Sequence, residues 1–446
     1  MANFITTAIS GYAKEGFEAY IRPLFVGANP LETPGVYPEM GIRGTKKLNF
    51  FTNPGKMLKA WVKGFVGTSL SALTQRELKT YQMKAEGAQD ANEFFDTVYG
   101  YAQNKNVDWD NITGTVLEEI IAEIWMSGVA SDIFRQYWLN DTNKETISSG
   151  KYTGTADTNY NAFDGIWKLL ITNATTTPTT EDHIFRVAFS NGSAAQVETL
   201  TLTGTSGTAT VTLGGKTYLA TFTTDLATSA ANFVTSHSAA LLLRGITVTS
   251  STDTVIFTAT IAGMPFSAPT IAGVSGNLGG SVAHTTANTA PVDLTSDEAL
   301  AALKALYVGA DARLKNLPAL QKVYLVSDSV YENYLDSLEG KSSTAYTFTT
   351  EEGRMLMING ANVLKYRGIP VVKMGWDVHL DADFPTAYPH RIIYTEITNL
   401  RLGFDDANDM NSFEAWYNRD EQENRFRTQF YMGCQYVHGA YTAVAY

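Results

Sequence analysis

The chain has 446 residues, enough for two or three domains, and 44% of them are apolar, which is ample for packed interiors. A formal net charge of −12 argues against a protein whose task is to coat nucleic acid, because phosphate contacts need lysine and arginine. Only 17% of residues are charged, so much of the surface is uncharged. Such a surface is typical of a subunit that buries its faces against neighbours.

The charge is unevenly distributed along the chain. Residues 1–85 carry eleven basic and five acidic side chains, a net charge of +6, which leaves −18 for residues 86–446. One later stretch is locally acidic, with a single Arg419 among Asp405, Asp406, Asp409, Glu414, Asp420, Glu421 and Glu423. These basic and acidic parts either attract each other between copies of the chain or form two solvated faces.

The only cysteine is Cys434, which excludes an intramolecular disulfide and a multi-cysteine metal site. A single cysteine also suits folding in a reducing cytoplasm. We expect no secretory signal, because the first residues lack a basic region followed by an apolar one. We expect no membrane span, because no stretch approaches eighteen consecutive apolar residues.

The first 40 residues are predicted to form an extended arm. An amphipathic helix is expected over residues 5–21, followed by Pro23, Pro30, Pro34 and Pro38. Each proline restricts the residue before it to extended geometry and removes a backbone donor. Such a segment cannot build its own core and has to lie along another surface.

Residues 41–85 are predicted to form a long loop or hairpin in which basic and aromatic side chains alternate. These side chains are Lys46, Lys47, Phe50, Phe51, Lys56, Lys59, Trp61, Lys63 and Phe65. The pattern fits a stripe that binds nucleic acid. It also fits a projecting arm that packs on a neighbouring subunit, with lysines extended at its rim, and we favour this second interpretation.

Helices are predicted over residues 89–103 and 111–139. The second has apolar side chains at three- and four-residue steps, which indicates one long buried stripe. The stripe consists of Val116, Ile120, Ile121, Ile124, Trp125, Val129, Ile133 and Phe134. A further helix is expected from Asp164 to Leu170.

The composition changes abruptly between residues 187 and 290, where Thr, Ser, Ala and Gly dominate. The charged residues there are Glu198, Lys216, Asp225, Arg244 and Asp253. Alternating β-forming residues predict two strand pairs, the first with a turn at Gly214 and Gly215. A helix that ends at Gly245 lies between the pairs. We therefore predict an inserted β-β-α-β-β module with at least one face exposed to solvent.

After residue 290, helix and strand patterns mix without a regular βαβ rhythm. A helix over residues 292–314 is expected to start at Thr295 or Ser296. KVYLVSD predicts a strand, SVYENYLDSL a helix, and GANVLKYRGIPVVKM a strand, a turn and a strand; the remaining residues are β-rich. This order favours an α+β fold over a doubly wound sheet.

No motif for catalysis or cofactor binding is present. The six histidines have no recognised metal-ligand spacing, and neither a phosphate-binding glycine loop nor a G-x-S-x-G elbow occurs. His379 has Asp377, Asp381 and Asp383 nearby, but the glycine and glutamate of a calcium loop are missing, so we favour a solvated loop. Cys434 is expected to be a small buried residue. We expect no enzyme, no cofactor and no metal site.

The order of these elements resembles that of the major capsid proteins of tailed bacteriophages, which have the Hong Kong ninety-seven type of fold. The phrases FDGIWKLL, VYLVSDSVYENYL and VLKYRGIPVV are most similar. They look closest to members from phages of Bacteroidetes hosts, including crAss-like phages. The resemblance covers most of residues 1–190 and 290–446.

The resemblance implies a division of the chain into domains. It implies an N-terminal arm (1–40), an extended loop (41–85) and a peripheral domain with a long spine helix (86–186 and 388–446). It further implies an axial domain (291–387), and residues 187–290 would be an inserted exterior domain.

The resemblance also implies a function in the virion. The chain would assemble in the host cytoplasm into hexamers and pentamers of an icosahedral shell around double-stranded DNA, without sequence-specific binding. Its partners would be other copies of itself and scaffolding, portal and auxiliary capsid proteins, with no membrane. The expected inter-subunit contacts are Lys46, Lys47, Lys56, Lys59, Trp61, Lys63, Asp405, Asp406 and Asp409.

Three other interpretations stay open. An encapsulin-like bacterial compartment shares this fold, although the large insertion disfavours it. A Thr-rich surface or adhesive protein is disfavoured by the lack of a signal peptide and of repeated modules. A cytoplasmic enzyme with an unrecognised site would reveal itself through a tightly bound cofactor.

Overall fold

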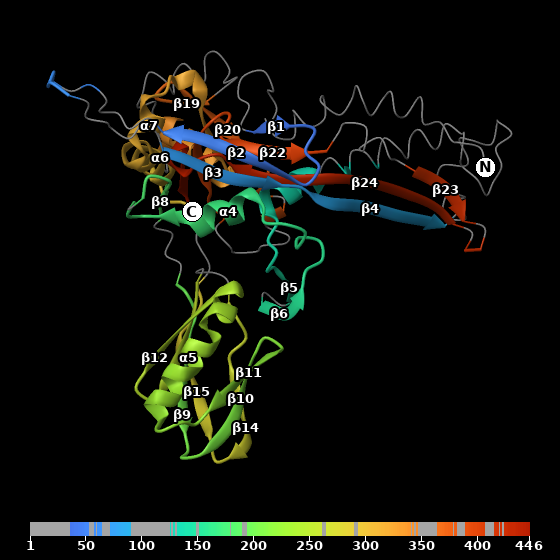
Figure 1. The fold of residues 1–446 in the computed structure, drawn as a ribbon, viewed down its shortest axis with the longest axis vertical. Coiled ribbons are helices and arrows are strands. Elements are labelled where there is room, and N and C mark those ends of the chain that lie inside the picture. The colour runs from blue at the N-terminus through green and yellow to red at the C-terminus, as the bar shows by residue number, and fades with distance from the viewer. Residues whose placement is uncertain are drawn as a thin grey trace.

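The computed structural model forms a mixed α+β fold (Figure 1). It describes residues 36–52, 58, 60–64, 72–90, 125, 128–129, 132–148, 151–178, 180–189, 194–260, 265–289, 293–339, 341–342, 345–346, 364–377, 379–380, 389–405, 414–418, 420–421 and 423–446. The helix expected over residues 5–21, and residues 91–124 of the two helices expected between 89 and 139, lie outside this part.

A seven-stranded sheet forms the centre of the body, a name used here for the described residues outside 194–289. Its order is β19 (Leu364–Tyr366), β20 (Ile369–Lys373), β16 (Lys322–Val326), β21 (Ile392–Glu396), β25 (Thr442–Ala445), β8 (Ile184–Val187) and β7 (Ala174–Thr175). Successive side chains of a strand point to opposite faces. Val323 and Leu325 therefore enter one hydrophobic core and Tyr324 and Val326 the other.

Helices α6 (Glu298–Gly309) and α8 (Asp328–Glu339) cover one face of this sheet through Leu303, Leu306, Val330 and Tyr334. The single helix expected over residues 292–314 is wrong, because α6 ends before Ala310, whose backbone is extended. A separate α7 (Ala312–Asn316) starts after Asp311, whose carboxylate accepts a bond from the Arg313 backbone N–H at 2.8 Å. The short 3-10 turns Ala319–Gln321 and Gly439–Tyr441 precede β16 and β25.

The opposite face is covered by α4 (Ile166–Asn173), by helical residues 132–139 and by a second sheet. Trp376 packs edge-on against Trp138 and Trp167, with both pairs of ring centroids 5.1 Å apart. The expected start of α4 at Asp164 is wrong. Its carboxylate instead accepts bonds from the backbone and hydroxyl of Thr142, and Gly165 occupies the N-cap position.

The second sheet has the order β1 (Tyr37–Glu39), β22 (Leu400–Phe404), β24 (Glu423–Tyr436) and β23 (Glu414–Asn418), and β4 (Tyr81–Asp90) also pairs with β24. On one side of the body, β4, β23 and β24 extend outward as a narrow ribbon (Figure 1). Residues 89 and 90, which were expected to begin a helix, are strand because Gln89 and Asp90 pair with Asn424 and Glu423.

Three two-stranded sheets complete the body. The first, β2 (Thr45–Thr52) with β3 (Ala72–Lys79), forms the hairpin expected within residues 41–85. The others are β5 (Glu145–Ser148) with β6 (Lys151–Ala156), and β17 (Lys341–Ser342) with β18 (Ala345–Tyr346). The strand, turn and strand expected after residue 360 are confirmed by β19 and β20, with a turn at Arg367 and Gly368.

Residues 194–289, called the Thr-rich module below, have a hydrophobic core of their own. One sheet has the order β11 (Lys216–Thr221), β10 (Gly207–Leu213), β14 (Thr270–Gly276); the other has β12 (Ile246–Ser251), β13 (Thr254–Ala259), β9 (Val197–Thr203), β15 (Gly279–Thr286). Seven strands accompany α5 (Leu226–Leu243), so the expected count of four is wrong. The Gly- and Ala-rich β14 and β15 have weak β-propensity, and pairing with β10 and β9 supplies their structure.

Two local predictions in the module are confirmed. Gly214 and Gly215 form the turn between β10 and β11 with positive φ values of 49° and 78°. Gly245 follows the end of α5, as predicted, with a φ of 73°, and at the start of this helix Asp225, which was not predicted as a cap, accepts a bond from the Thr228 backbone N–H. The turn and the end of the helix both need positive φ values, which glycine adopts without steric cost.

Candidate functional site

The projecting hairpin of β2 and β3 carries apolar side chains into solvent. Its tip, defined as residues 58 and 60–64, extends away from the body (Figure 1). Leu58 is 99% exposed, Trp61 89% and Val62 68%. Phe51 and Leu73 lie directly opposite each other in the hairpin and are also exposed. Exposed apolar groups gathered in this way mark a surface that contacts another molecule.

The base of the hairpin is fixed to the body. Leu48 and Leu78 pack with Ile42 in a small buried cluster. The Thr80 hydroxyl bonds to the carbonyls of Ile42 and Gly44. These contacts hold the base of the hairpin in place, while its tip projects into solvent.

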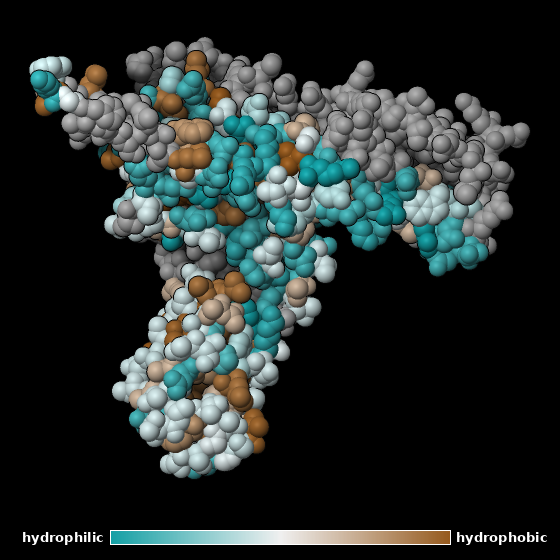
Figure 2. All heavy atoms as spheres, viewed as in Figure 1, coloured by the Kyte–Doolittle hydropathy of each residue, from teal (hydrophilic) through white to brown (hydrophobic). Residues whose placement is uncertain are grey.

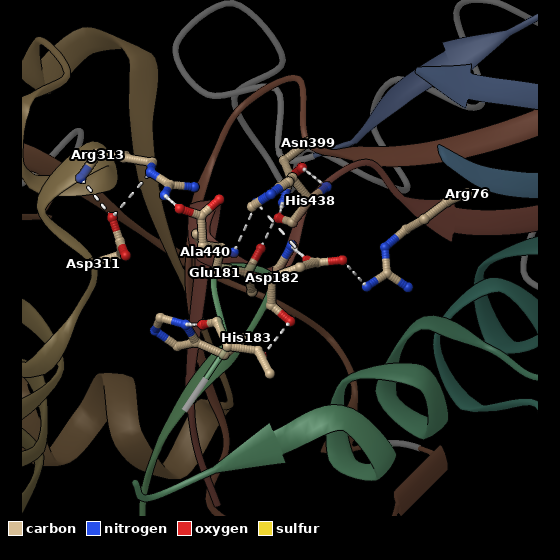
Figure 3. Close-up of polar contacts among 12 residues, drawn as sticks. Arg76, Glu181, Asp182, His183, Asp311, Arg313, Asn399, His438 and Ala440 are labelled. Carbon is tan, nitrogen blue, oxygen red and sulfur yellow. Dashed lines mark hydrogen bonds and ion pairs between the residues drawn. The ribbon is translucent and has the colours of Figure 1, made fainter. Parts of the chain in front are cut away.

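A cluster of charged and polar residues lies where the hairpin meets the body (Figure 3). Arg76 donates to the Asp182 carboxylate at 2.6 Å, and the Gly439 backbone N–H donates to the same carboxylate at 2.6 Å. The Arg76 guanidinium also lies over the Tyr436 ring at 4.0 Å. One carboxylate thus joins β3 to the C-terminal segment.

His438 lies buried in the same cluster. Burial lowers the pKa of its imidazole, partly opposed by Asp182. Its Nδ1 accepts a bond from the Ala440 backbone N–H at 3.2 Å, which a neutral imidazole can do. Asn399 bonds to both the backbone N–H and the carbonyl of His438. His438 is therefore fixed where the hairpin contacts the C-terminal segment, and no sequence pattern had singled it out.

Several of the expected assembly residues have partners within the chain. Lys46 pairs with Glu39 at 2.5 Å, and Asp405 pairs with Arg43 at 2.7 Å. Lys47, Trp61 and Lys63 are exposed. The structure therefore joins the basic and the acidic segment inside one copy through Arg43 and Asp405, whereas the pair of Lys46 and Glu39 lies within the N-terminal segment. Lys56, Lys59, Asp406 and Asp409 lie outside the described residues.

A groove of about 370 Å³ runs between the ribbon and the helical residues that cross it. Its apolar lining consists of Met83, Ala85, Trp125, Val129, Ile133, Ala162, Phe430 and Met432. The rest of the lining is charged or polar and consists of Lys84, Glu86, Asp132, Arg135, Gln136, Thr158 and Asn159. Trp125 donates from its indole to the Thr428 hydroxyl at 3.0 Å. Gly87 makes this possible, because a Cβ there would lie 2.5 Å from the Trp125 ring. This groove was not anticipated from the sequence.

Two side-chain groups are of types that take part in catalysis elsewhere: the pair of Ser329 with His390, and the thiol of Cys434. Ser329 Oγ lies 2.8 Å from His390 Nδ1 at the start of α8. The Asp377 carboxylate accepts a bond from the Asp328 backbone N–H there and so caps the start of α8. Cys434 is buried, and burial raises the pKa of its thiol, which suppresses the reactive thiolate.

The acidic loop near His379 does not form a metal site within the described residues. Asp377 caps α8, while the nearby Asp381 and Asp383 are not among the described residues. Within the described ranges, no three His, Cys, Asp or Glu side chains are grouped so as to hold a metal ion. No helix in the described part of the chain combines the length and apolar character needed to cross a membrane.

No protein-family model and no curated protein matches this sequence. Among solved structures, the chain is similar to the capsid of an empty GTA particle, with 6% identity and a TM-score of 0.42 over 92% of this chain and 87% of that chain. It is similar to the capsid of Myoviridae phage XM1, with 10% identity and a TM-score of 0.41 over 92% and 89%. It is also similar to the satellite phage P4 procapsid that includes the size determination protein, with 7% identity and a TM-score of 0.38 over 100% and 91%.

Proposed function

We propose that this chain is the major capsid protein of a tailed bacteriophage. It assembles in the host cytoplasm into hexamers and pentamers of an icosahedral shell that encloses double-stranded DNA in the virion. The observation that carries the proposal is the apolar tip of the projecting hairpin, where Leu58, Trp61 and Val62 are exposed. A soluble monomer gains nothing from these side chains, whereas a shell subunit buries them against a neighbour.

The groove on the ribbon is a suitable receptor for that tip. Its lining combines apolar side chains, among them Trp125 and Phe430, with charged ones such as Arg135, and its volume of about 370 Å³ accommodates one or two large side chains. The tip and the groove are different surfaces of the same chain. A contact between two different patches runs head to tail, and closed rings result when its rotation closes. We therefore propose that the tip of one copy occupies the groove of the next.

We also propose the division into arm (1–40), extended loop (41–85), peripheral domain (86–186 and 388–446), inserted exterior domain (187–290) and axial domain (291–387). The hairpin supports the extended loop, and the separate core of the Thr-rich module supports the insertion. The central sheet continues across the boundary at residue 387, since β16 pairs with β21. The peripheral and axial domains are thus proposed to share one sheet.

The module surface supports an exterior position. Figure 2 shows it mostly white, which corresponds to residues that are neither strongly hydrophilic nor strongly hydrophobic, whereas the body is mainly teal. Few charges suit a module that does not face DNA phosphates. The proposed partners are other copies, scaffolding, portal and auxiliary capsid proteins, and packaged DNA held without sequence-specific contacts.

Electron microscopy with sedimentation of the expressed full-length chain, with and without a candidate scaffolding protein, tests the proposal. Closed shells, tubes or rings are expected. Trp61→Ser and Leu58→Ser should reduce the assembled fraction by about tenfold or more, because each removes a buried apolar contact. Val274→Ser is the matched control, since Val274 is 61% exposed on the module and should not affect assembly.

A monodisperse monomer under all these conditions would refute the shell-forming proposal. Normal assembly of both tip variants would refute the proposed role of the tip while leaving shell formation intact. Shells that form around a protein cargo instead of DNA would favour the compartment interpretation.

A further inference from the structure

A buried ion pair connects the Thr-rich module to the body. Glu145 begins β5 of the body, and Arg244 follows the last residue of α5 in the module, 99 residues later. We infer that this pair is a latch that sets the orientation of the module relative to the body. The inference concerns the isolated subunit and does not depend on the proposed function.

The Arg244 guanidinium is fully satisfied by the groups around it. Its Nε donates to Glu145 Oε1 at 2.6 Å and its Nη2 to Glu145 Oε2 at 3.0 Å, a two-pronged contact with one carboxylate. Three further bonds reach the Leu213 carbonyl at 2.8 Å, the Tyr218 hydroxyl at 3.2 Å and the Gly214 carbonyl at 3.1 Å. A guanidinium has five N–H donors, so each has an acceptor.

Both charges are removed from water. The side chains of Arg244 and Glu145 are 5% and 4% exposed. Lys216, also in the module, approaches the same Glu145 oxygen at 3.4 Å from a more exposed position. Breaking such a pair leaves an uncompensated buried charge, so the two partners strongly disfavour any geometry that separates them.

Further contacts hold each partner of the latch in place on its own side. Arg244 is fixed by the end of α5 and by the turn between β10 and β11. On the body side, Lys144 pairs with Asp157 at 3.4 Å and lies over the Tyr160 ring at 3.6 Å, which anchors the start of β5. A contact between two rigid supports fixes an orientation, whereas a contact between flexible loops does not.

Packing around the pair is too loose to set that orientation. A cavity of about 610 Å³ lies beside it, lined by Asn143 and Ala156 of the body and by Lys216, Ala240 and Leu243 of the module. Apolar residues of the module form a core separate from the two cores of the body. Without continuous packing across this space, the ion pair is the contact that resists rotation of the module.

The test uses Glu145→Gln in the full-length chain. Glutamine keeps the shape of the side chain but loses the charge and presents two donors, so the two-pronged contact cannot form. The substitution is in the body, which leaves the internal bonds of Arg244 to the module in place. Spin labels are attached through Lys304→Cys on α6 and Thr249→Cys on β12, both exposed, while Cys434 is buried. Labelled chain is diluted with unlabelled chain so that only distances within one copy are measured.

We expect a single narrow distance distribution for the chain with Glu145, and a distribution about twice as wide or a second population for Glu145→Gln. Glu198→Gln is the matched control, because Glu198 is an equally buried carboxylate whose partners Gln196 and His284 are both in the module. It should leave the distribution unchanged.

Hydrogen exchange in β9, β10 and β13 separates loss of orientation from unfolding of the module. The expected result is protection within about twofold of the parent chain together with the broadened distances. An unchanged distribution in Glu145→Gln would overturn the inference. Broadening accompanied by lost protection in these strands would also overturn it, because the pair would then be stabilising the module itself.

Discussion

Phe50 of β2 lies against the imidazole of His438, with ring centroids 4.3 Å apart and an interplanar angle of 43°. Its ring also meets Tyr441 edge-on at 5.5 Å. One aromatic side chain of the projecting hairpin is therefore inserted between two rings of the C-terminal segment. This contact, with the Arg76 ion pair to Asp182, determines how firmly the hairpin is held at its base.

Phe50→Ala should loosen the hairpin. Removing a half-buried ring loses apolar burial and aromatic contact, which costs about 1–3 kcal/mol. Hydrogen exchange of β2 and β3 in the unassembled subunit measures the effect as faster exchange. Phe51→Ala is the control, because the Phe51 ring is 68% exposed. This substitution should change the opening free energy derived from hydrogen exchange by no more than about 0.5 kcal/mol. Equal effects of the two variants would show that Phe50 has no anchoring role.

His438 should make stability depend on pH. Burial lowers the pKa of the folded imidazole below its ordinary value of 6.5. The imidazole therefore binds a proton more readily in the unfolded chain. The contribution of His438 to the free energy of unfolding is fully present above about pH 6.5, and it is lost as the pH falls through the folded pKa. Urea midpoints between pH 7.5 and pH 5 should decrease for the parent chain and decrease less for His438→Gln. Parallel profiles would contradict the prediction.

Gly87→Ala should separate the ribbon from Trp125. The added Cβ would lie 2.5 Å from the indole, so the ring has to move and its bond to Thr428 is weakened. Overpacking of this kind costs about 1–3 kcal/mol, measurable by urea unfolding followed through tryptophan fluorescence. Gly128→Ala in the crossing helix meets nothing within 4 Å and should be neutral or stabilise by about 0.5–1 kcal/mol. Destabilisation by both variants would point to backbone effects instead.

Cys434 should resist thiol reagents in the folded chain. Its side chain is buried in β24, and burial raises the pKa of the thiol well above its usual range, so little thiolate is present at neutral pH. Labelling with an aromatic disulfide reagent should be slower by about a hundredfold or more than in urea, because reaction requires opening of the strand. Rapid labelling under native conditions would show that β24 opens readily at this position.

The sequence by itself determined the features that depend on neighbouring residues. The alternating Thr-rich pattern, the turn at Gly214 and Gly215, and the end of α5 at Gly245 follow from local propensity and backbone geometry. The mixed α+β character and the exposed aromatic at Trp61 were also evident from composition and patterning. Each of these is encoded within a window of a few residues.

Tertiary structure alone decided which distant segments meet. The strands β14 and β15 have little β-propensity and exist because β10 and β9 supply their hydrogen bonds. The contact of Phe50 with His438 and the pair of Glu145 with Arg244 join residues far apart in the chain. Periodicity reports which face of an element is apolar, but it does not specify the partner surface. That choice depends on packing among all the elements, which is a property of the folded chain as a whole.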